Sequence, residues 1–308
     1  MARVDRYKDI QLPQLRSFCL AATEGNFTAA AKALGISAPT VWQQVRALER
    51  HLRTTLLRRR GRNVELTPEG QALLELVQPH VSGLDSLEAL FQARQAAIPQ
   101  QLTVAAIPYL ISSHLVEPVR VFSAAHPGVR LKLQVCVWFD EVVRQVEQGH
   151  ADLGVLFCNR DQPRSPHLDY QHLFNLHLAL LTPADHPLAR KKQLRPRDLV
   201  QYPLIVPPEG SYARTALDQL LHRHNLNAQE HIVIETVLLD IIKKYVAAGV
   251  GVALVHIGAE IDPMPGVHVR RLDAKRNEIS AAVVARKGAH PTATALAFRR
   301  ILEERLAE

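Results

Sequence analysis

The sequence predicts three parts in series: an α-helical domain (residues 1–66), a long linker helix (67–97) and a two-lobed α/β domain (98–308). Two observations predict this division. Apolar residues recur at helical spacing up to the end of the linker, whereas beyond it β-branched runs alternate with amphipathic helices. Charge divides the chain as well, because residues 1–62 carry a net charge of +8 and the remainder carries −1. Such asymmetry favours a polyanionic partner, above all nucleic acid.

The composition excludes several classes of protein. The chain has 308 residues, 47% apolar and 22% charged, which is enough for sizeable cores. No window approaches ~18 consecutive apolar residues, so we expect no transmembrane helix and no membrane partner. The mixed-charge start argues against a secretory signal, and the odd cysteine count (Cys19, Cys136, Cys158) fits free thiols. We therefore expect a cytoplasmic protein.

Two short helices are predicted first. Residues 12–24 repeat apolar positions at helical spacing, and the Gly25-Asn26 pair ends that helix. Residues 28–34 form the second helix, for which we predict Thr28 as the N-cap.

A third helix follows a tight turn. Gly35 to Ser37 form the turn, and the helix spans about residues 38–52, with Ser37 as N-cap and Pro39 in the first turn. Its inward stripe is predicted to be Val41, Val45, Leu48 and Leu52.

A hairpin and a long helix complete the first hundred residues. Two short strands within residues 56–66 flank the basic turn Arg58 to Arg62. Thr67 and Pro68 then open a helix with heptad-like spacing, in which Pro79 either introduces a kink or divides the helix. The apolar seam is Leu73, Val77, His80, Leu84, Leu87 and Phe91, a spacing that favours dimerisation over packing within one chain.

The remaining residues follow the pattern of an open α/β sheet with crossover helices and a ligand cleft between two lobes. The predicted strands are 102–107, 129–137, 152–157, 176–181, 204–206, 231–236, 251–255 and 279–285.

Helix, tight turn and helix with a basic outer face form the helix-turn-helix arrangement, whose last helix fits the major groove. Gln43 can bind adenine through two hydrogen bonds, and Arg46 can read guanine or bind a phosphate. Thr40 and the Trp42 ring can touch thymine methyl groups, and Thr28 suits a phosphate oxygen. The basic hairpin would lie beside the duplex as a wing. The predicted DNA-binding set is Thr28, Ser37, Pro39, Thr40, Trp42, Gln43, Arg46, Arg59, Arg60 and Arg62.

Ordinary alternatives exist for several features. The arginine run could be a solvated face, and Trp42 could pack on a neighbouring helix or subunit. His222 and His224 lie on different helix faces and no metal-binding motif occurs, so we expect no metal. Cys136 and Cys158 could form a redox pair, although buried structural thiols are commoner.

We see no convergent catalytic set, which argues against an enzyme, and we expect no cofactor. An architectural DNA-binding protein would not need so large an α/β domain.

Short motifs in a fixed order carry a family resemblance. They are Phe27–Ala31, Leu34–Val41, Gln44–Glu49 and Leu66–Gly70, followed by His186–Leu188, Pro203–Ile205 and Val246–Leu254. Together they resemble the LysR-type transcriptional regulators, with the winged helix-turn-helix from Leu15 to Gly70.

The resemblance implies an architecture and partners. It implies a homodimer held by the linker helix through Leu73, Val77, Leu84, Leu87 and Phe91, often within a tetramer. It also implies double-stranded DNA, a small-molecule effector and RNA polymerase as partners. The C-terminal domain would be like periplasmic solute-binding proteins, with lobe one at about 98–165 plus 267–308 and lobe two at about 166–266.

The chain departs from the family in places that affect specificity. Trp42 stands where a small serine is usual, Ala38 where glutamine is frequent, and Leu57 where phenylalanine is usual. The operator preference therefore does not transfer. Residues 240–246 are similar to the sulfate-sensing, cysteine-biosynthesis branch, but the positions of its ligands here, Ala106, Pro108 and Tyr109, lack the same donors.

The resemblance also places the effector cleft. Several of its residues are aromatic, which favours an apolar or aromatic ligand body with one anionic group held by Ser211 and nearby N–H groups. The cleft residues are Ile107, Pro108, Tyr109, Trp138, Phe139, Phe157, Ser211, Tyr212, Val237, Leu238 and His256.

Overall fold

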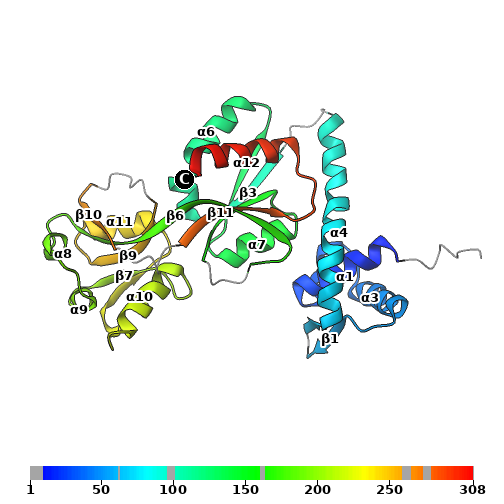
Figure 1. Cartoon of the computed structure of the whole chain (residues 1–308), viewed down its shortest axis with the longest axis horizontal. Helices are drawn as coiled ribbons and strands as arrows, with labels where there is room; N and C mark the ends of the chain where they lie inside the picture. The colour runs from blue at the N-terminus through cyan, green and yellow to red at the C-terminus, as the bar shows by residue number, and fades with distance from the viewer. Residues whose placement is uncertain are drawn as a thin grey trace, which may run out of the picture. The chain divides into compact units, whose positions relative to one another are not determined.

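A computed structural model describes residues 10–61, 63–95, 101–159, 164–258, 265–272 and 279–307. The chain divides into two compact units, residues 1–98 with 286–292 and residues 99–285 with 293–308, and each is described by itself (Figure 1). The predicted wing residue Arg62 and the predicted boundary between residues 97 and 98 lie outside the described residues.

The first unit contains the three predicted short helices, α1 (Leu12–Glu24), α2 (Phe27–Leu34) and α3 (Ala38–Leu52). The predicted N-cap of the second helix is wrong. Asn26 caps α2, because its side-chain oxygen accepts hydrogen bonds from the N–H groups of Thr28 at 2.7 Å and Ala29 at 3.4 Å. Thr28 is consequently the second residue of the helix, and its side chain is exposed.

The turn between α2 and α3 follows the prediction. Gly35 ends α2 with a φ of 66°, a left-handed conformation that glycine adopts readily. Ser37 caps α3, and its hydroxyl accepts a hydrogen bond from the Thr40 N–H at 3.3 Å. The core of the unit contains buried residues from all three helices, including Phe18, Ala30, Val41, Val45 and Leu48.

The hairpin and the long helix also form. Strands β1 (Leu57–Arg60) and β2 (Asn63–Leu66) pair antiparallel, and the Val64 N–H donates to the Gly25 carbonyl at 2.8 Å, which anchors the wing to the end of α1. Helix α4 (Pro68–Gln95) is continuous through Pro79, so the seam is not divided into two helices.

The seam of α4 has two kinds of environment. Its first half, Leu73 and Val77, packs against the core of the first unit together with the buried Leu74 and Val81. Its second half is exposed, with Leu84, Leu87 and Phe91 at 44%, 50% and 63%. Packing within one chain, the alternative to dimerisation, therefore applies to the first half of the seam only.

The second unit is a nine-stranded sheet in the order β4-β3-β5-β11-β6-β9-β7-β8, with β10 paired to β6 (Figure 1). Its strands are β3 (Gln101–Ala106), β4 (Arg130–Val135), β5 (Leu153–Cys158), β6 (Leu168–Pro183), β7 (Leu204–Val206), β8 (Ile232–Glu235), β9 (Val252–Ile257), β10 (Val267–Arg271) and β11 (Ile279–Arg286). Its helices are α5 (Pro108–Ser113), α6 (Val116–Ala125), α7 (Phe139–Glu147), α8 (Pro187–Arg190), α9 (Pro196–Leu199), α10 (Tyr212–His222), the 3-10 helix η2 (Gln229–His231), α11 (Leu239–Ala247) and α12 (Ala293–Leu306).

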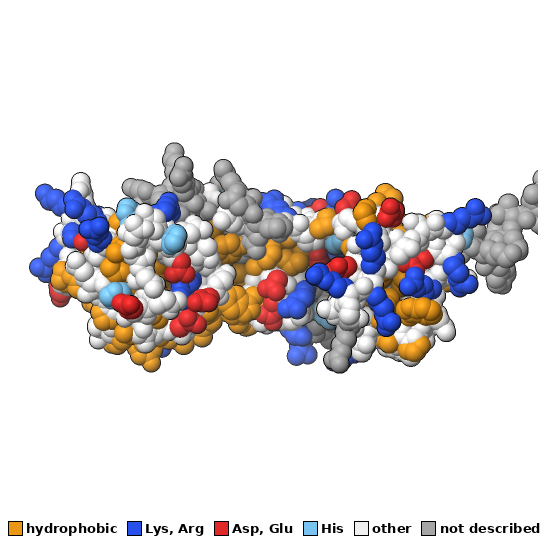
Figure 2. All heavy atoms as spheres, turned by 90° about the horizontal axis from the view of Figure 1, so that it is seen from below, with side chains coloured by type: hydrophobic (Ala, Val, Ile, Leu, Met, Phe, Trp, Pro, Cys, Tyr) orange, Lys and Arg blue, Asp and Glu red, His pale blue; other side chains and the backbone are white. Residues whose placement is uncertain are grey.

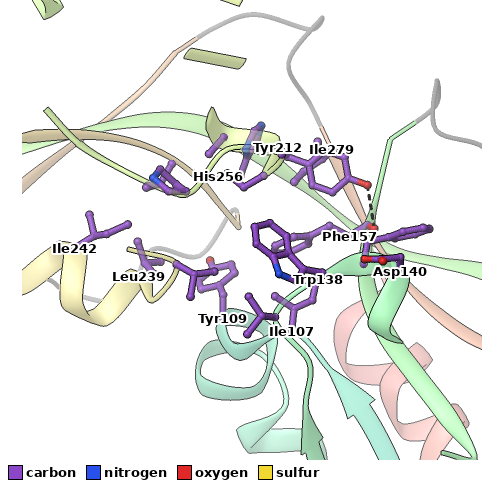
Figure 3. A pocket seen from close by; sticks show the side chains of 18 residues that line it. Ile107, Tyr109, Trp138, Asp140, Phe157, Tyr212, Leu239, Ile242, His256 and Ile279 are labelled. Carbon is purple, nitrogen blue, oxygen red and sulfur yellow. Dashed lines mark hydrogen bonds between the residues drawn. The ribbon is translucent and has the colours of Figure 1, made fainter. Parts of the chain in front are cut away.

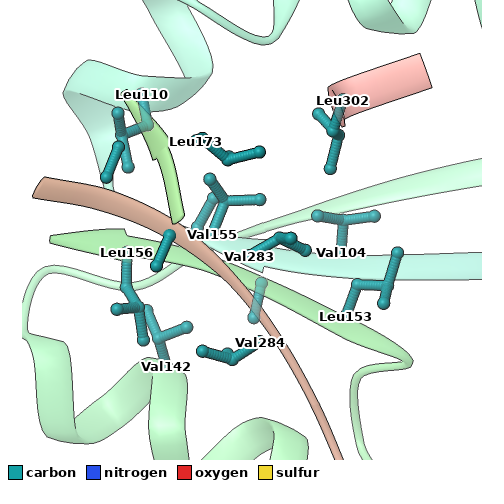
Figure 4. Close-up of a cluster of buried hydrophobic side chains, with 14 of the residues drawn as sticks. Val104, Leu110, Val142, Leu153, Val155, Leu156, Leu173, Val283, Val284 and Leu302 are labelled. Carbon is teal, nitrogen blue, oxygen red and sulfur yellow. The ribbon is translucent and has the colours of Figure 1, made fainter. Parts of the chain in front are cut away.

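Lobe one forms around β3, β4, β5 and β11. Helices α6 and α12 cover one face of this sheet and α7 covers the other (Figure 1). Figure 4 shows the fully buried aliphatic side chains between these layers, among them Val104, Val142, Val155 and Leu302.

Lobe two has two cores on opposite faces of its strands. Leu178 and Leu180 of β6 pack with α10, while the alternate residues Ala179 and Leu181 pack with α11. Because successive side chains of a strand point to opposite faces, one apolar run supplies both cores.

The predicted lobe boundaries need correction. The chain passes between the lobes within β6, since Leu173 and Leu176 belong to the core of lobe one and Leu178 to that of lobe two. Strand β10, which the prediction assigns to lobe one and does not recognise as a strand, pairs with residues 179–183 of β6 in lobe two. Strand β11 and helix α12 lie in lobe one, as expected.

Candidate DNA-binding surface and ligand cavity

Helix α3 separates its residues as predicted. Val41, Val45 and Leu48 are at most 1% exposed and face the core, whereas Trp42 is 44% exposed and Gln43 and Arg46 are also exposed. The outer face of α3 therefore presents one aromatic, one amide and one guanidinium group within five residues.

Two neighbouring glutamines of α3 have different roles. The side-chain oxygen of Gln44 accepts a hydrogen bond from the buried Ser17 hydroxyl of α1, so Gln44 joins two helices. Gln43 points away from this contact and is exposed. Thr40 is partly buried and its hydroxyl lies 2.7 Å from that of Ser37, so both hydroxyls already have a partner at the start of α3.

Glu49 is a site residue that the sequence analysis missed. It is only 6% exposed, and its carboxylate accepts hydrogen bonds from the N–H groups of Leu56 at 2.9 Å and Leu57 at 3.2 Å. The same carboxylate binds Arg46 at 2.7 Å, and the Arg46 guanidinium lies 5.6 Å from the centre of the Trp42 ring. The signal in the sequence is a charged residue beside the buried stripe of α3.

The wing presents its arginines to solvent. Arg58, Arg59 and Arg60 are exposed, and Arg60 forms an ion pair with Glu65 at 2.7 Å across the hairpin. Because both partners are exposed, this pair contributes little to stability. Figure 2 shows lysine and arginine side chains spread over this unit on the face in view.

The second unit contains a cavity of about 350 Å³ between the lobes. Its wall includes nine of the eleven predicted cleft residues, whereas Pro108 and Leu238 are not part of it. The predicted residues in the wall are Ile107, Tyr109, Trp138, Phe139, Phe157, Ser211, Tyr212, Val237 and His256. Gly210 and Leu239 also line the wall and belong to the segments 210–212 and 237–239 that the resemblance places at the cleft. Those that the prediction missed are Val137, Asp140, Pro207, Ala213, Ile242, Val255 and Ile279.

The side chains of the wall come from both lobes. Figure 3 shows Ile107, Tyr109 and Trp138 of lobe one together with Leu239 and His256 of lobe two around the cavity. Three helices of nine or more residues, α7, α10 and α11, begin at the cavity, because their first residues line it. The N-terminal ends of helices carry partial positive charge.

The two tyrosine hydroxyls of the wall are already hydrogen-bonded within the protein. The Tyr109 hydroxyl accepts a hydrogen bond from the Gly258 N–H at 3.1 Å and lies 3.3 Å from His114 Nε2. The Tyr212 hydroxyl donates to the Phe157 carbonyl at 3.4 Å, and burial raises the pKa of Tyr212, so this side chain is neutral. Ser211, Asp140, His256 and Trp138, through its indole N–H, are the other side chains of the described wall that carry a polar atom.

The cysteines are free and buried. Burial raises the pKa of Cys19 to about 12 and that of Cys136 to about 11, and it also raises the pKa of Cys158. At neutral pH these groups are thiols, the less reactive form, which favours the structural interpretation over a redox pair.

Within the described residues, no group of three or more His, Cys, Asp or Glu side chains could hold a metal ion. No described helix is long and apolar enough to cross a membrane.

A basic helix-turn-helix with a wing, followed by a two-lobed domain with an internal cavity, defines a ligand-responsive DNA-binding protein. Residues 96–307 match the profile of the LysR substrate binding domain, and residues 12–71 match that of the bacterial regulatory helix-turn-helix protein of the lysR family. The chain therefore belongs to the LysR family of transcriptional regulators, which bind DNA and respond to small-molecule effectors through the C-terminal domain.

Relatives and solved structures agree with this family. The chain is 27% identical to the HTH-type transcriptional activator CmpR of Synechocystis sp. over 253 residues, which cover 81% of this chain and 80% of CmpR. It is 32% identical to the HTH-type transcriptional regulator TfdS of Cupriavidus pinatubonensis over 252 residues, 80% of this chain and 82% of TfdS. Full-length CbnR complexed with its target DNA has a similar fold, with 23% identity, a TM-score of 0.54 and coverage of 96% of this chain and 99% of that chain.

Proposed function

We propose that this regulator reads its operator through the outer face of α3 and the wing, and that its effector has an apolar, aromatic body and one anionic group. The observation that carries the ligand class is the cavity wall. Aromatic and aliphatic side chains dominate it, and its described residues include no lysine or arginine. A volume of about 350 Å³ is at the lower end for ligand pockets, which favours a small ligand with one or two rings.

Helix N-termini, rather than a basic side chain, would hold the anionic group. The N-terminus of α7 already has its own carboxylates, Asp140 and Glu141, and the latter accepts a hydrogen bond from the Val137 N–H at 3.0 Å. Helices α10 and α11 also begin at the cavity. The Ser211 hydroxyl accepts a hydrogen bond from the Arg214 N–H at 3.3 Å, and its own proton can be donated to a ligand. We therefore place the anionic group beside Ser211, at the N-terminus of α10.

On the DNA side, Gln43 would read base edges while Thr40, Trp42 and Arg46 would pack beside it. Thr28, Ser37 and Pro39 lie at the starts of α2 and α3, where phosphate oxygens would fit. Arg59 and Arg60, with Arg62 of the same hairpin sequence, would contact the backbone or the minor groove.

A homodimer would bury the exposed half of the α4 seam. Leu84, Leu87 and Phe91 form an apolar row at coiled-coil spacing, and such rows are rarely left in solvent. Assembly of two dimers into a tetramer is the further step that we propose for the promoter-bound state.

The cellular role follows from the DNA partner and the relatives. We propose a cytoplasmic regulator without enzymatic activity or a cofactor, because the relatives are regulators. CmpR is named an activator, which supports RNA polymerase as a further partner.

The effector class can be tested with tryptophan fluorescence and titration calorimetry. The chain has two tryptophans, so a Trp42→Phe variant leaves only Trp138, whose ring stands in the cavity. We expect saturable quenching by a member of a panel containing benzoate, salicylate and phenylacetate, with weaker binding of benzyl alcohol and benzylamine. Heat from sulfate binding, without binding of any aromatic carboxylate, would overturn the proposed class.

A matched variant tests the position of the anionic group. Ser211→Gly removes the hydroxyl but keeps most of the capping preference, whereas Ser211→Thr keeps both. We expect Ser211→Gly to weaken carboxylate binding about tenfold, the loss of one hydrogen bond to a charged group, and to leave benzyl alcohol binding unchanged. Equal effects on both ligands would place the anionic group elsewhere.

A further inference from the structure

Arg53 ends α3 in a backbone conformation that arginine rarely adopts. Its φ is 53°, and in the described parts of the chain the only other non-glycine residue with positive φ is Asn225. Residues with a Cβ avoid this left-handed region, and asparagine tolerates it better than arginine. Glycine is the usual residue at such helix ends. An arginine at this position therefore points to a role for its side chain.

Hydrogen bonds hold the backbone around Arg53 in one conformation. The Thr54 N–H donates to the Glu49 carbonyl at 3.1 Å and the Arg53 N–H donates to the Arg50 carbonyl at 3.4 Å, the pair of bonds that closes a helix in the Schellman motif. The Glu49 carboxylate then accepts the Leu56 N–H at 2.9 Å. The segment that follows α3 is thus tied back to the helix, and Arg53 projects from a fixed backbone.

Arg53 continues a row of exposed residues along α3. Trp42, Arg46 and Arg50 are spaced by four residues, which places them on one side of α3, and Arg53 follows directly after the last helical residue. Together with Gln43, Glu49, Thr54 and Thr55 they line one open groove. Arg46 is neutralised by Glu49, whereas Arg53 makes no ion pair with any residue that the structure describes.

The spacing along α3 decides what Arg53 can meet on DNA. Gln43 and Arg53 are ten residues apart, which corresponds to about 15 Å along a helix axis. The major groove is about 12 Å wide. If the N-terminal end of α3 enters the groove and Gln43 lies over base edges, Arg53 at the other end of the helix would lie beyond the bases, at the level of the phosphates. A guanidinium without an ion pair can bind a phosphate through two parallel hydrogen bonds.

We infer that Arg53 binds a DNA phosphate, at the end of α3 opposite to the base-reading residues. This contact is additional to the wing and is absent from the predicted DNA-binding set. It makes the groove between Trp42 and Arg53 a continuous contact surface, with base recognition at one end and phosphate recognition at the other.

Substitution of Arg53 by glycine separates this role from a structural one. Arg53→Gly relieves the left-handed conformation, so the melting temperature should stay the same or rise. Removal of one phosphate contact should lower the slope of log K against log salt by about 0.9 for each DNA-binding domain on the duplex. The affinity should fall about eightfold per domain at 0.1 M salt and about fourfold at 0.2 M. The loss should be the same on the operator and on random duplex.

Two further variants make the test decisive. Arg53→Lys keeps the positive charge, so it should retain most of the slope of log K against log salt. Asn225→Gly makes the same backbone change in the other unit and should leave DNA binding unchanged. Wild-type affinity and slope in Arg53→Gly would overturn the inference. A loss confined to the operator would overturn it as well, because it would indicate a base contact.

Discussion

The DNA-binding surface and the ligand cavity are built in opposite ways. The groove on α3 is formed by eight residues between Trp42 and Thr55, which are close together in the sequence, and most of them are exposed. The cavity wall is drawn from segments between Ile107 and Ile279, and its members are mainly apolar. DNA is a polyanion of nearly constant shape, so one helix with unpaired charged side chains can bind it. A small molecule must be enclosed, which requires the tertiary fold of two lobes.

The difference extends to the forces at each site. Free arginines on α3 and the wing make DNA binding dependent on salt, because each phosphate contact releases counterions. The cavity offers helix ends and apolar surface, whose contributions depend far less on ionic strength. The two sites are therefore expected to be separable, and the following substitutions test this separation.

The largest effect is expected for Gly70→Ala. A Cβ at this position would lie 2.1 Å from the Leu56 carbonyl oxygen. Because this oxygen belongs to the backbone, it cannot move away without distorting the surrounding structure. We expect a loss of about 3 kcal/mol or more in the stability of the first unit, measured by urea unfolding. DNA binding should be lost, whereas the cavity should keep its ligand affinity, because it belongs to the other compact unit.

A control for Gly70→Ala is Gly128→Ala. No atom lies within 4 Å of a Cβ built on Gly128, and its φ is not left-handed, so neither site should change. Loss of ligand binding in Gly70→Ala would show that the two units unfold together, and the comparison between them would fail.

A medium effect is expected within α3 itself. Gln43→Ala should weaken operator binding by about 1–3 kcal/mol and leave random duplex unchanged, because only base contacts are lost. Gln44→Ala is the matched variant. It removes the partner of the buried Ser17 hydroxyl and should cost about 1 kcal/mol of folding stability, with discrimination between the two duplexes retained. Equal losses on both duplexes for Gln43→Ala would remove that residue from base recognition.

The same contrast explains what could be predicted from sequence. The division of α3 into a buried and an exposed face depends on residues that are close together in the sequence, and so does the Ser37 N-cap. Both were predicted correctly. The cap of α2 was wrong because Asn26 and Thr28 are both good N-cap residues, and only the backbone decides which one comes first. Strand β10 was missed because three of its five residues, His268, Arg270 and Arg271, are polar, so it does not read as an apolar run.

The cavity could be predicted only through the family resemblance. That resemblance supplied the segments at the cavity, but Pro108 and Leu238 are absent from the wall although their neighbours Ile107, Tyr109 and Leu239 line it. Ile242 shows why the missing members were not found. It lies one helical turn from Leu239, and only the orientation of α11 brings both to the wall.

The smallest effect is expected for Glu147, and the comparison is with Glu49, a second glutamate with little exposure in the other unit. Glu49 in the DNA-binding unit accepts hydrogen bonds from two N–H groups and one arginine, so its charge is well compensated. Glu147 in lobe one has one hydrogen-bond partner among the residues that the structure describes, the Ser165 hydroxyl, and burial raises the pKa of Glu147. Folding therefore favours the protonated form of Glu147. Its contribution to stability is fully present below the unfolded pKa and is lost as the pH rises through the folded pKa.

Glu147→Gln should consequently stabilise the second unit at pH 8, by roughly 0.5 kcal/mol, because glutamine keeps an acceptor for Ser165 and carries no charge. The advantage over the wild-type protein should shrink as the pH is lowered towards 4, and paired urea titrations across this range measure it. Glu49→Gln should do the opposite and cost about 1–3 kcal/mol at pH 8, since Arg46 loses its ionic partner. A constant advantage of Glu147→Gln at all pH values would mean that packing, rather than the buried charge, distinguishes the two glutamates.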